Sequence, residues 1–139
     1  MKRTALALVL LTLVAGACSR EERQLDAARR RWEAAGITTY TYTIVMSCFC
    51  PPLDAVVEVV DGRVVSVTPF FTGSITPEAR TVEELFDDLE QELTSADRGD
   101  YTIEYDPELG CPVLVVADPI RQAIDDEYSY SIFLEAVTG

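Results

Sequence analysis

Apolar residues recur along the chain with two different spacings, and these spacings divide it into helices and strands. In two segments the apolar positions fall every three or four residues, which predicts amphipathic helices. Ser19 with Glu22 indicates a capping box at the start of the first helix, and Gly36 suits its end. Thr81 with Glu84 begins the second helix in the same way. The apolar stripes of the two helices are Leu25, Ala28, Trp32 and Ala35, and then Val82, Leu85, Phe86, Leu89 and Leu93.

Elsewhere apolar and polar residues alternate, and this period of two predicts half-buried strands. The first strand has an apolar face that runs from Tyr40 to Cys50, and Pro51-Pro52 ends it. Asp61-Gly62 between two β-branched runs predicts a hairpin. The segment 113–117 is apolar without a break, which favours a strand with both faces covered. The predicted strands are residues 39–50, 55–60, 63–68, 101–105, 113–117 and 128–137.

The order of these elements is helix, three strands, helix, three strands. Strands that follow one another through short links pair mostly in antiparallel fashion, and two amphipathic helices need an apolar sheet face on which to pack. The sequence therefore predicts an α+β fold, with an antiparallel sheet of about six strands and both helices on one face. About 120 residues suffice for one domain with a single core, and we assign residues 18–139 to it.

The first 17 residues have the features of a signal peptide. Lys2 and Arg3 precede a short apolar run that ends in small residues before Cys18, which is the order of a cleavable secretory leader. The run is shorter than the roughly 20 apolar residues of a membrane-spanning helix. Residues 14–18, Val-Ala-Gly-Ala-Cys, resemble a bacterial lipobox, in which the cysteine is acylated and becomes the new N-terminus. We expect a protein anchored through Cys18 to the outer face of a bacterial membrane; ordinary secretion with a free Cys18 is the alternative.

The chain is strongly acidic and contains no histidine. It has 24 Asp and Glu against 11 Lys and Arg, a net charge of -13, and the loss of Lys2 and Arg3 with the signal peptide brings this to -15. Nucleic-acid phosphates need a positive surface, so we expect no nucleic-acid partner. A chain without histidine lacks the commonest general base and the commonest zinc ligand. Chemistry by carboxylates, thiols or tyrosines remains open. From the sequence as a whole we expect no resident cofactor and no enzymatic activity.

The cysteines beyond Cys18 are candidates for a disulfide, which is the default in an exported protein. Cys48 and Cys50 lie two apart on one strand face, where their Cα atoms would be about 6.5–7 Å apart, at the upper limit for a disulfide. A bond between them requires a bend near Pro51. Cys111 is the other possible partner for one of them. A reactive thiol site at Cys48 and Cys50 is the alternative to a structural bond.

An acidic group near the C-terminus is the candidate ligand site. Asp118, Asp125, Asp126 and Glu127 flank a predicted hairpin loop. Their carboxylate oxygens suit calcium, which takes about six to eight oxygen ligands, although the EF-hand pattern is absent. A solvated loop whose aspartates form turns is the alternative. The six tyrosines all fall on predicted strands, where they either pack in the core or line an aromatic binding surface.

Several short motifs follow one another in a characteristic order over roughly residues 25–138. They are Arg31-Trp32, Gly36-Ile37, Tyr40-x-Tyr42, Cys48-Phe49-Cys50-Pro51, Asp61-Gly62, Thr81-Val82 with Leu85-Phe86, Tyr105-Asp106-Pro107 with Gly110-x-Pro112, and Asp118 before Asp125-Asp126-Glu127. In this order they resemble the bacterial domain of unknown function DUF6174. The resemblance implies a small exported or lipid-anchored protein and implies no activity. Cys111 departs from the family pattern, which often has an aromatic residue at that place.

Together these features predict a lipid-anchored, non-enzymatic interaction or binding module of the cell envelope, with another envelope protein as its expected partner. A small-ligand or calcium-binding domain that uses the loop 118–127 is the second hypothesis. A thiol-dependent redox protein that uses Cys48 and Cys50 is the third.

Overall fold

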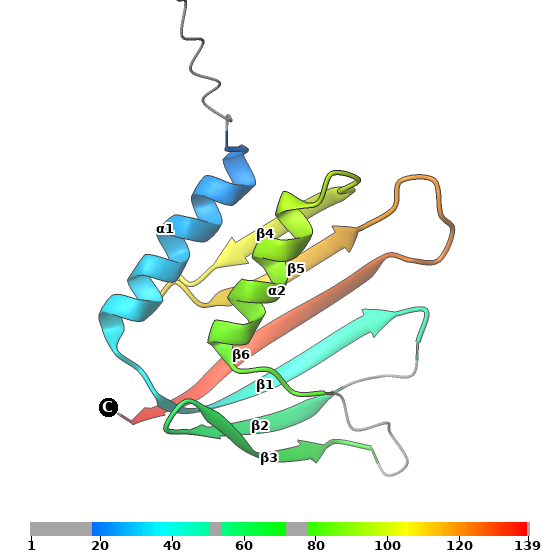
Figure 1. Ribbon diagram of the computed structural model, residues 1–139. Coiled ribbons are helices and arrows are strands. Elements are labelled where there is room, and N and C mark those ends of the chain that lie inside the picture. Colours follow the sequence, from blue (N-terminus) through cyan, green and yellow to red (C-terminus); the bar gives the residue numbers. More distant parts are fainter. Residues whose placement is uncertain (1–17, 51–53, 72–77, 139) are drawn as a thin grey trace, which may run out of the picture.

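The computed structural model describes residues 18–50, 54–71 and 78–138, which form two helices and six strands (Figure 1). The elements are α1 (Arg20–Ala35), β1 (Thr39–Cys48), β2 (Ala55–Val60), β3 (Arg63–Pro69), α2 (Val82–Thr94), β4 (Asp100–Tyr105), β5 (Pro112–Asp118) and β6 (Tyr128–Thr138). The predicted α+β fold and its order of elements are confirmed. The leader 1–17 and the Pro51-Pro52 strand stop lie outside the described residues, and the signal peptide stays a prediction. Neither described helix is long and apolar enough to span a membrane.

The six strands form one antiparallel sheet in the order β3-β2-β1-β6-β5-β4. β1 and β6 are the longest strands, and they pair from Thr39 opposite Thr138 to Cys48 opposite Tyr128. β6, the last strand in the chain, therefore lies between β1 and β5 and joins the two halves of the sheet. The predicted hairpin at Asp61-Gly62 connects β2 and β3, with positive φ angles of 49° and 70° at its two residues, as a tight turn of this kind requires.

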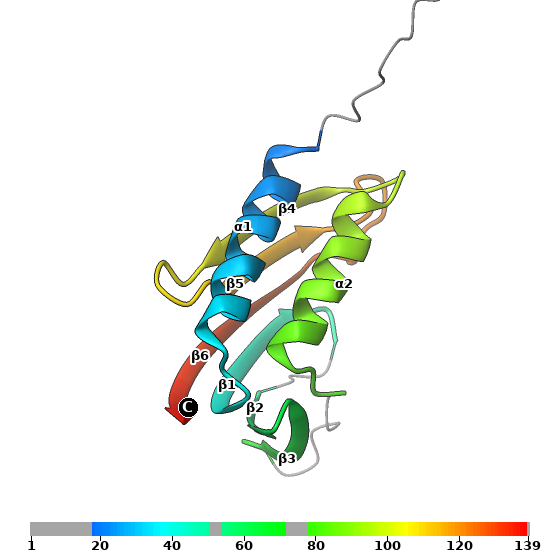
Figure 2. The ribbon, with the colours of Figure 1, turned by 60° about the vertical axis from the view of Figure 1, so that its left-hand side comes forward.

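Both helices lie on the same face of the sheet, as predicted (Figure 2). The whole predicted stripe of α2 is buried, and from α1 the side chains of Leu25, Ala28 and Trp32 are buried. Ala35, the last residue of α1, is exposed, so the predicted stripe was one position too long. α1 also packs along α2, where the Arg29 guanidinium lies 5.6 Å from the centre of the Phe86 ring. The core is therefore enclosed between two adjacent helices and one sheet face.

Neither of the two described helices covers the other face of the sheet. In β5, Val115 is fully buried whereas its neighbour Val116 is 45% exposed, and Phe133 of β6 is 57% exposed. The prediction that residues 113–117 are covered on both faces is therefore wrong. Side chains alternate between the two faces of a strand, and both helices pack on only one of them, so every second residue of this apolar run is left to solvent.

The two predicted helix caps differ in completeness. At α2 the capping box is complete: the Glu84 N–H donates to Thr81 Oγ1 (3.2 Å), and the Thr81 N–H donates to the Glu84 carboxylate (2.8 Å). At α1, Ser19 Oγ accepts from the Glu22 N–H (3.1 Å). The Glu22 carboxylate lies 3.6 Å from the Arg98 guanidinium. The Glu22 carboxylate therefore pairs with Arg98 and does not complete the capping box by accepting a hydrogen bond from the Ser19 N–H.

Tyr40 and Tyr42 of β1 fix the N-terminal end of α2 over the sheet. The Tyr40 hydroxyl accepts a hydrogen bond from the Val82 N–H (2.7 Å) and donates one to the Glu83 carboxylate (3.3 Å). The Tyr42 hydroxyl donates to the carbonyl oxygen of Arg80. These side chains keep the start of α2 at a set height above β1, and the space that they leave beneath the helix is the pocket described next.

Candidate ligand-binding pocket

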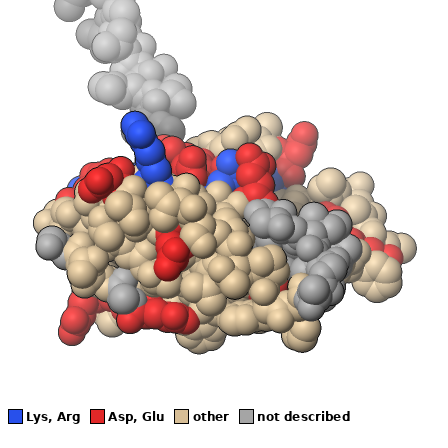
Figure 3. Space-filling view, turned by 90° about the horizontal axis from the view of Figure 1, so that it is seen from below, with Lys and Arg blue, Asp and Glu red and all other residues tan. Residues whose placement is uncertain are grey.

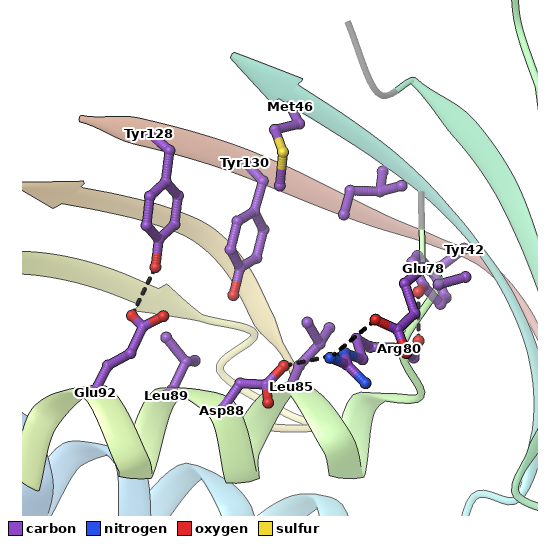
Figure 4. A pocket seen from close by; sticks show the side chains of 12 residues that line it. Tyr42, Met46, Glu78, Arg80, Leu85, Asp88, Leu89, Glu92, Tyr128 and Tyr130 are labelled. Atoms are coloured by element: carbon purple, nitrogen blue, oxygen red, sulfur yellow. Dashed lines mark hydrogen bonds and ion pairs between the residues drawn. The ribbon is translucent and has the colours of Figure 1, made fainter. Parts of the chain in front are cut away.

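A pocket of about 290 Å³ lies between α2 and the central strands β1 and β6 (Figure 4). Three separate parts of the chain supply its walls: residues 42–46 of β1, residues 78–92 before and within α2, and residues 128–130 of β6. The lining residues are Tyr42, Ile44, Met46, Glu78, Ala79, Arg80, Leu85, Asp88, Leu89, Glu92, Tyr128 and Tyr130. Because β1 and β6 pair only in the folded sheet, the pocket exists only after the whole domain has assembled.

The middle of the pocket is apolar, because both surrounding elements direct regularly spaced apolar side chains toward it. Ile44 and Met46 are two residues apart on β1 and therefore project to the same face, the one on which α2 lies. Leu85 and Leu89 are four residues apart on α2 and lie on its buried side. An apolar molecule between these four side chains would be removed from water, which is favourable by roughly 25 cal/mol for each Å² buried.

Tyr128 and Tyr130 of β6 bring hydroxyl groups into the pocket. Their rings are parallel, with centres 6.2 Å apart, because the two residues occupy alternate positions of one strand. The Tyr128 hydroxyl donates a hydrogen bond to the Glu92 carboxylate (2.6 Å). Burial, and then the nearby Glu92, raise the pKa of both tyrosines well above the ordinary value. Burial likewise raises the pKa of Tyr42 to about 12. These hydroxyls therefore stay protonated at neutral pH and serve as hydrogen-bond donors.

Four charged side chains line the pocket on the helix side. Arg80 pairs with two of the carboxylates, at 3.5 Å from Glu78 and 3.3 Å from Asp88. Glu92 has no such partner: within the described ranges no Lys or Arg nitrogen lies within 4.0 Å of its carboxylate. Glu92 is half-buried. The pocket thus combines an apolar middle, tyrosine hydroxyls and one carboxylate without a countercharge.

Two of the four cysteines, Cys48 and Cys50, lie together, and Cys18 and Cys111 lie elsewhere in the domain. Cys48 and Cys50 lie at disulfide-bonding distance, with their Cα atoms 5.0 Å apart. This is shorter than a flat strand allows, because β1 ends at Cys48 and the chain bends at the next two residues. Cys18 is exposed before α1.

Cys111, the other partner considered for a disulfide, is a free thiol buried at the start of β5. Cys48 and Ala117 lie level with each other across the sheet, because both pair with Tyr128. Cys111 precedes Ala117 by six residues of extended chain, so it lies about 20 Å along the strand direction from the level of Cys48. That separation is far beyond disulfide geometry. Burial raises the pKa of the Cys111 thiol to about 11, so it is unreactive at neutral pH.

The acidic loop brings three of its four predicted residues together. Carboxylate oxygens of Asp118, Asp126 and Glu127 all lie within 4.8 Å of one another. Partial burial, followed by the charges of Asp126 and Glu127, raises the pKa of Asp118. Asp125 does not belong to this group; it has a positive φ of 72° and serves the turn. Asp126 also accepts a hydrogen bond from the Ile120 N–H (2.8 Å), so one of its oxygens already has a structural role.

Acidic side chains dominate the charged surface of the domain. On the side seen in Figure 3 they are scattered over a largely uncharged surface, and basic side chains show only along one border. Arg29, Arg80, Arg98 and Arg121 all pair with carboxylates. That the protein has no nucleic-acid partner stays a prediction, and these ion pairs agree with the charge argument behind it.

Sequence reasoning did not identify the pocket, although it placed most of its walls correctly. Glu92, Asp88 and Arg80 were not among the predicted site residues. A partial signal was present: Asp88 and Glu92 are four residues apart beside the apolar stripe of α2, so they border the buried face. The tyrosines were predicted as core or as an aromatic binding surface. Tyr42 and Tyr130 are buried in the core and also line the pocket, and their role as a binding surface stays a prediction.

Comparison with known proteins gives a family and nothing more specific. A model of a family of unknown function, DUF6174, matches residues 24–134. No curated protein and no solved structure matches the chain. The match extends from within α1 into β6 and so includes every residue of the pocket.

Proposed function

The chain belongs to DUF6174, a family of unknown function, and we propose that it is a lipid-anchored, non-enzymatic binding module of the cell envelope that takes up a small amphipathic molecule. The observation that carries this proposal is the pocket between α2 and the strands β1 and β6. Ligand pockets are mostly apolar, with a few convergent polar groups, and measure roughly 300–1,000 Å³. The pocket of about 290 Å³ is just below the lower limit of that range, which suits a small ligand, and its lining has this composition.

The chemistry of the pocket favours binding over catalysis. The chain has no histidine, and the pKa values of Tyr128 and Tyr130 are raised by burial, so these hydroxyls are poor bases and poor nucleophiles. A catalytic base or acid works best when its pKa lies near the operating pH. Among the described cysteines, the Cys111 thiol is also kept protonated. The same groups are good hydrogen-bond donors and packing surfaces for a bound molecule.

The location of Cys18 supports attachment to a membrane at one end of the domain. Ser19, the next residue, accepts a hydrogen bond from Arg98 (2.9 Å). Gly99 packs directly against the backbone of Asp118 and Pro119. These contacts place the start of α1, which Cys18 precedes, at the same end of the domain as the loop that follows β5 (Figure 1). This loop exposes two isoleucines, Ile120 and Ile124, at 58% and 87%. Acyl chains on Cys18 would hold this end of the domain, with its exposed isoleucines, at the bilayer surface. More than one acyl chain gives stable anchoring.

Two experiments test this function. For the anchor, cells are labelled with a fatty-acid analogue: the wild-type chain should be labelled and Cys18→Ala should not. Equal labelling of both would contradict lipidation at this residue.

For the pocket, binding of octan-1-ol to the chain from residue 18 onward is measured by calorimetry, with Cys18→Ser to prevent oxidation. Ala79 lines the pocket, so Ala79→Phe should fill it and abolish binding. Ala34→Phe, at an exposed position of α1, is the matched control and should bind normally. Equal binding by both variants would show that the alcohol binds elsewhere.

The convergence of Asp118, Asp126 and Glu127 favours a second candidate function, calcium binding at the loop 118–127. Three carboxylates supply up to six oxygens, which is near the number that calcium takes. Calcium titration should then give one saturable site that is lost in Asp126→Asn. Asp97→Asn changes the same charge in another exposed loop and should retain the site. A flat titration of the wild-type chain ends this alternative.

A further inference from the structure

We propose that the molecule bound in the pocket carries an ammonium group, that Glu92 binds this group, and that the rest of the molecule is an apolar body about 10 Å long. This inference rests on the proposed function and specifies the ligand of the same pocket.

The charge balance of the lining carries the first step. Of the four charged side chains, Arg80 is within 3.5 Å of Glu78 and within 3.3 Å of Asp88, so its single charge is shared between two carboxylates. With Glu92 the lining has three negative charges and one positive. A ligand cation reduces this imbalance, whereas a fatty acid or another anion would be repelled by the excess of negative charge.

The position of Glu92 selects where the cation binds. Glu92 lies in the last turn of α2, where the helix macrodipole is negative and attracts cations. That last turn contains no basic residue, and Arg98 of the following loop donates a hydrogen bond to the Leu93 carbonyl oxygen (3.3 Å). Arg98 therefore compensates part of the helix end, and the attraction for a ligand cation rests mainly on the Glu92 carboxylate. The Glu92 carboxylate accepts a hydrogen bond from Tyr128 at 2.6 Å, and the Tyr101 hydroxyl also lies near it. A carboxylate has about four lone-pair sites, so Glu92 can accept further hydrogen bonds from an ammonium group without losing the Tyr128 contact.

The tyrosine rings add a second preference for a cation. Tyr128 and Tyr130 extend from β6 toward α2, and the Tyr128 hydroxyl reaches Glu92 (Figure 4). A cation within about 6 Å of a tyrosine ring is attracted by its π electrons, and the parallel pair presents two such rings at one end of the pocket. A neutral hydroxyl group on the ligand would use the same hydrogen-bond acceptor but would gain neither of these charge terms.

The length of the apolar wall sets the size of the ligand. From Leu85 to Glu92 the helix advances seven residues, which is about 10 Å. Along this length Leu85 and Leu89 face Ile44 and Met46 across the pocket. The ligand class is therefore an amphipathic amine with a hydrocarbon or aromatic body, and an octyl chain is a suitable probe.

The test compares three probes of equal chain length: octylammonium, octan-1-ol and octanoate. Binding to the chain from residue 18 onward, with Cys18→Ser, is measured by calorimetry at neutral pH. We expect octylammonium to bind most tightly and octanoate not to bind. In Glu92→Gln, which keeps a carbonyl acceptor for Tyr128, octylammonium should bind about tenfold to a hundredfold more weakly, while octan-1-ol is unaffected. Glu90→Gln is the matched control on the same helix, because Glu90 faces Arg29 and does not line the pocket.

The outcomes separate this inference from the function on which it rests. If octylammonium and octan-1-ol bind equally and Glu92→Gln changes neither, the ammonium site is refuted and the apolar pocket stands. If octanoate binds best, the charge argument is refuted as well. If none of the three probes binds to a chain that unfolds cooperatively on heating, both the pocket and the ammonium site are refuted. A reduced affinity for octylammonium in Glu90→Gln as well would show only a general effect of the net charge.

Discussion

Glu83 shows how much one side chain contributes to the position of α2. Its carboxylate accepts a hydrogen bond from the Trp32 indole N–H (2.7 Å) and another from the Tyr40 hydroxyl (3.3 Å). It therefore connects α1, β1 and the first turn of α2. Trp32 and Tyr40 also contact each other edge to face, with ring centres 5.2 Å apart. Both rings are almost fully buried, whereas Glu83 itself is exposed, so its carboxylate satisfies two donors of the core from the surface of the domain.

Glu83→Ala is expected to lower the free energy of unfolding by about 2–3 kcal/mol, because hydrogen bonds to a charged acceptor are stronger than neutral ones and two buried donors lose theirs. Urea unfolding followed by circular dichroism measures the change. Asp87→Ala removes an exposed acid of the same helix that pairs only with Arg29, and it should cost at most about 1 kcal/mol. Equal effects of the two substitutions would show that the Glu83 contacts add nothing.

Cys111 provides a test of burial at the scale of one residue. Its side chain is 1% exposed, and burial raises its pKa to about 11. Iodoacetamide at pH 8 should therefore leave Cys111 unmodified in the native protein and modify it fully in urea, as mass spectrometry of the peptides will show. Cys18, exposed in the unlipidated chain, is the internal control and should react under both conditions. Rapid native labelling of Cys111 would contradict the buried position.

At the scale of elements, the loop that precedes β4 packs closely against the end of the neighbouring strand β5. The loop before β4 passes so close to the end of β5 that a Cβ atom on Gly99 would lie 1.6 Å from the Asp118 carbonyl oxygen. Arg98, the residue before Gly99, in turn contacts Ser19 and Glu21 at the α1 N-terminus, so the start of α1 and the end of β5 lie at the same end of the domain. The proposed anchor and the two exposed isoleucines Ile120 and Ile124 therefore belong to the same end of the domain.

Gly99→Ala should destabilise the domain by about 1–3 kcal/mol, because the backbone must move to admit the methyl group. Its effect on thermal unfolding is compared with that of Gly62→Ala. At Gly62 a Cβ would meet no atom within 4 Å, although φ is +70°, so only the strain of a left-handed conformation is added, about 1 kcal/mol. A smaller loss at Gly99 than at Gly62 would contradict the close packing of the two loops.

At the scale of the whole molecule, the tyrosines connect stability to alkaline pH. Burial raises the pKa values of Tyr40, Tyr105, Tyr128 and Tyr130 and those of Tyr42 and Tyr101 to about 12. In the unfolded chain each ionises near 10. The folded state therefore binds the hydroxyl protons more tightly than the unfolded chain does. This difference contributes fully to the free energy of unfolding below pH 10, and the contribution is lost as the pH rises toward 12 and beyond.

The free energy of unfolding should accordingly be level from pH 8 to 9.5 and then fall, by up to about 1.4 kcal/mol per buried tyrosine for each further pH unit. Tyr40 and Tyr42, which are 2% and 1% exposed, should contribute most, and the partly exposed tyrosines less. Urea unfolding at several pH values measures the profile. Tyr42→Phe should show a smaller decline than the wild-type chain. A profile that stays level to pH 11 would contradict the burial of the tyrosine hydroxyls.

The orientation of the whole domain on a membrane makes a separate prediction. Unlipidated chain with Ile120→Ser and Ile124→Ser should bind phosphatidylcholine vesicles about tenfold more weakly than the unlipidated parent, because two apolar side chains no longer enter the interface. Uncharged vesicles are used because the acidic domain is repelled by anionic lipid. Val60→Ser, an exposed position at the opposite end of the sheet, is the control. An equal loss in Val60→Ser would contradict the proposed orientation.

The sequence by itself determined the elements of this protein. Helix stripes, strand alternation, the Thr81 capping box and the Asp61-Gly62 turn are set by residues within one or two turns or strand repeats of each other, so their spacing can be interpreted locally. The one-sided packing of two helices on an antiparallel sheet also followed from these patterns. Two predictions from local spacing were wrong. Ala35 was assigned to the buried stripe, but a stripe does not show where a helix leaves the core. The run 113–117 was expected to be covered on both faces, but an apolar run does not show which layers lie on each side of the sheet.

Only the tertiary structure decided how distant segments meet. The pairing of β6 with β1 joins residues that are up to 99 positions apart, and nothing in either strand alone selects that partner, since any strand edge offers the same backbone hydrogen bonds. This pairing brings Tyr128 and Tyr130 beside Met46 and beneath Glu92, and so it forms the pocket. The bend that joins Cys48 to Cys50 is likewise a property of where β1 ends in the sheet. A pocket made from three elements forms only when the whole domain is packed. The free energy of that packing depends on contacts between distant residues, and the spacing of residues along the chain does not show those contacts.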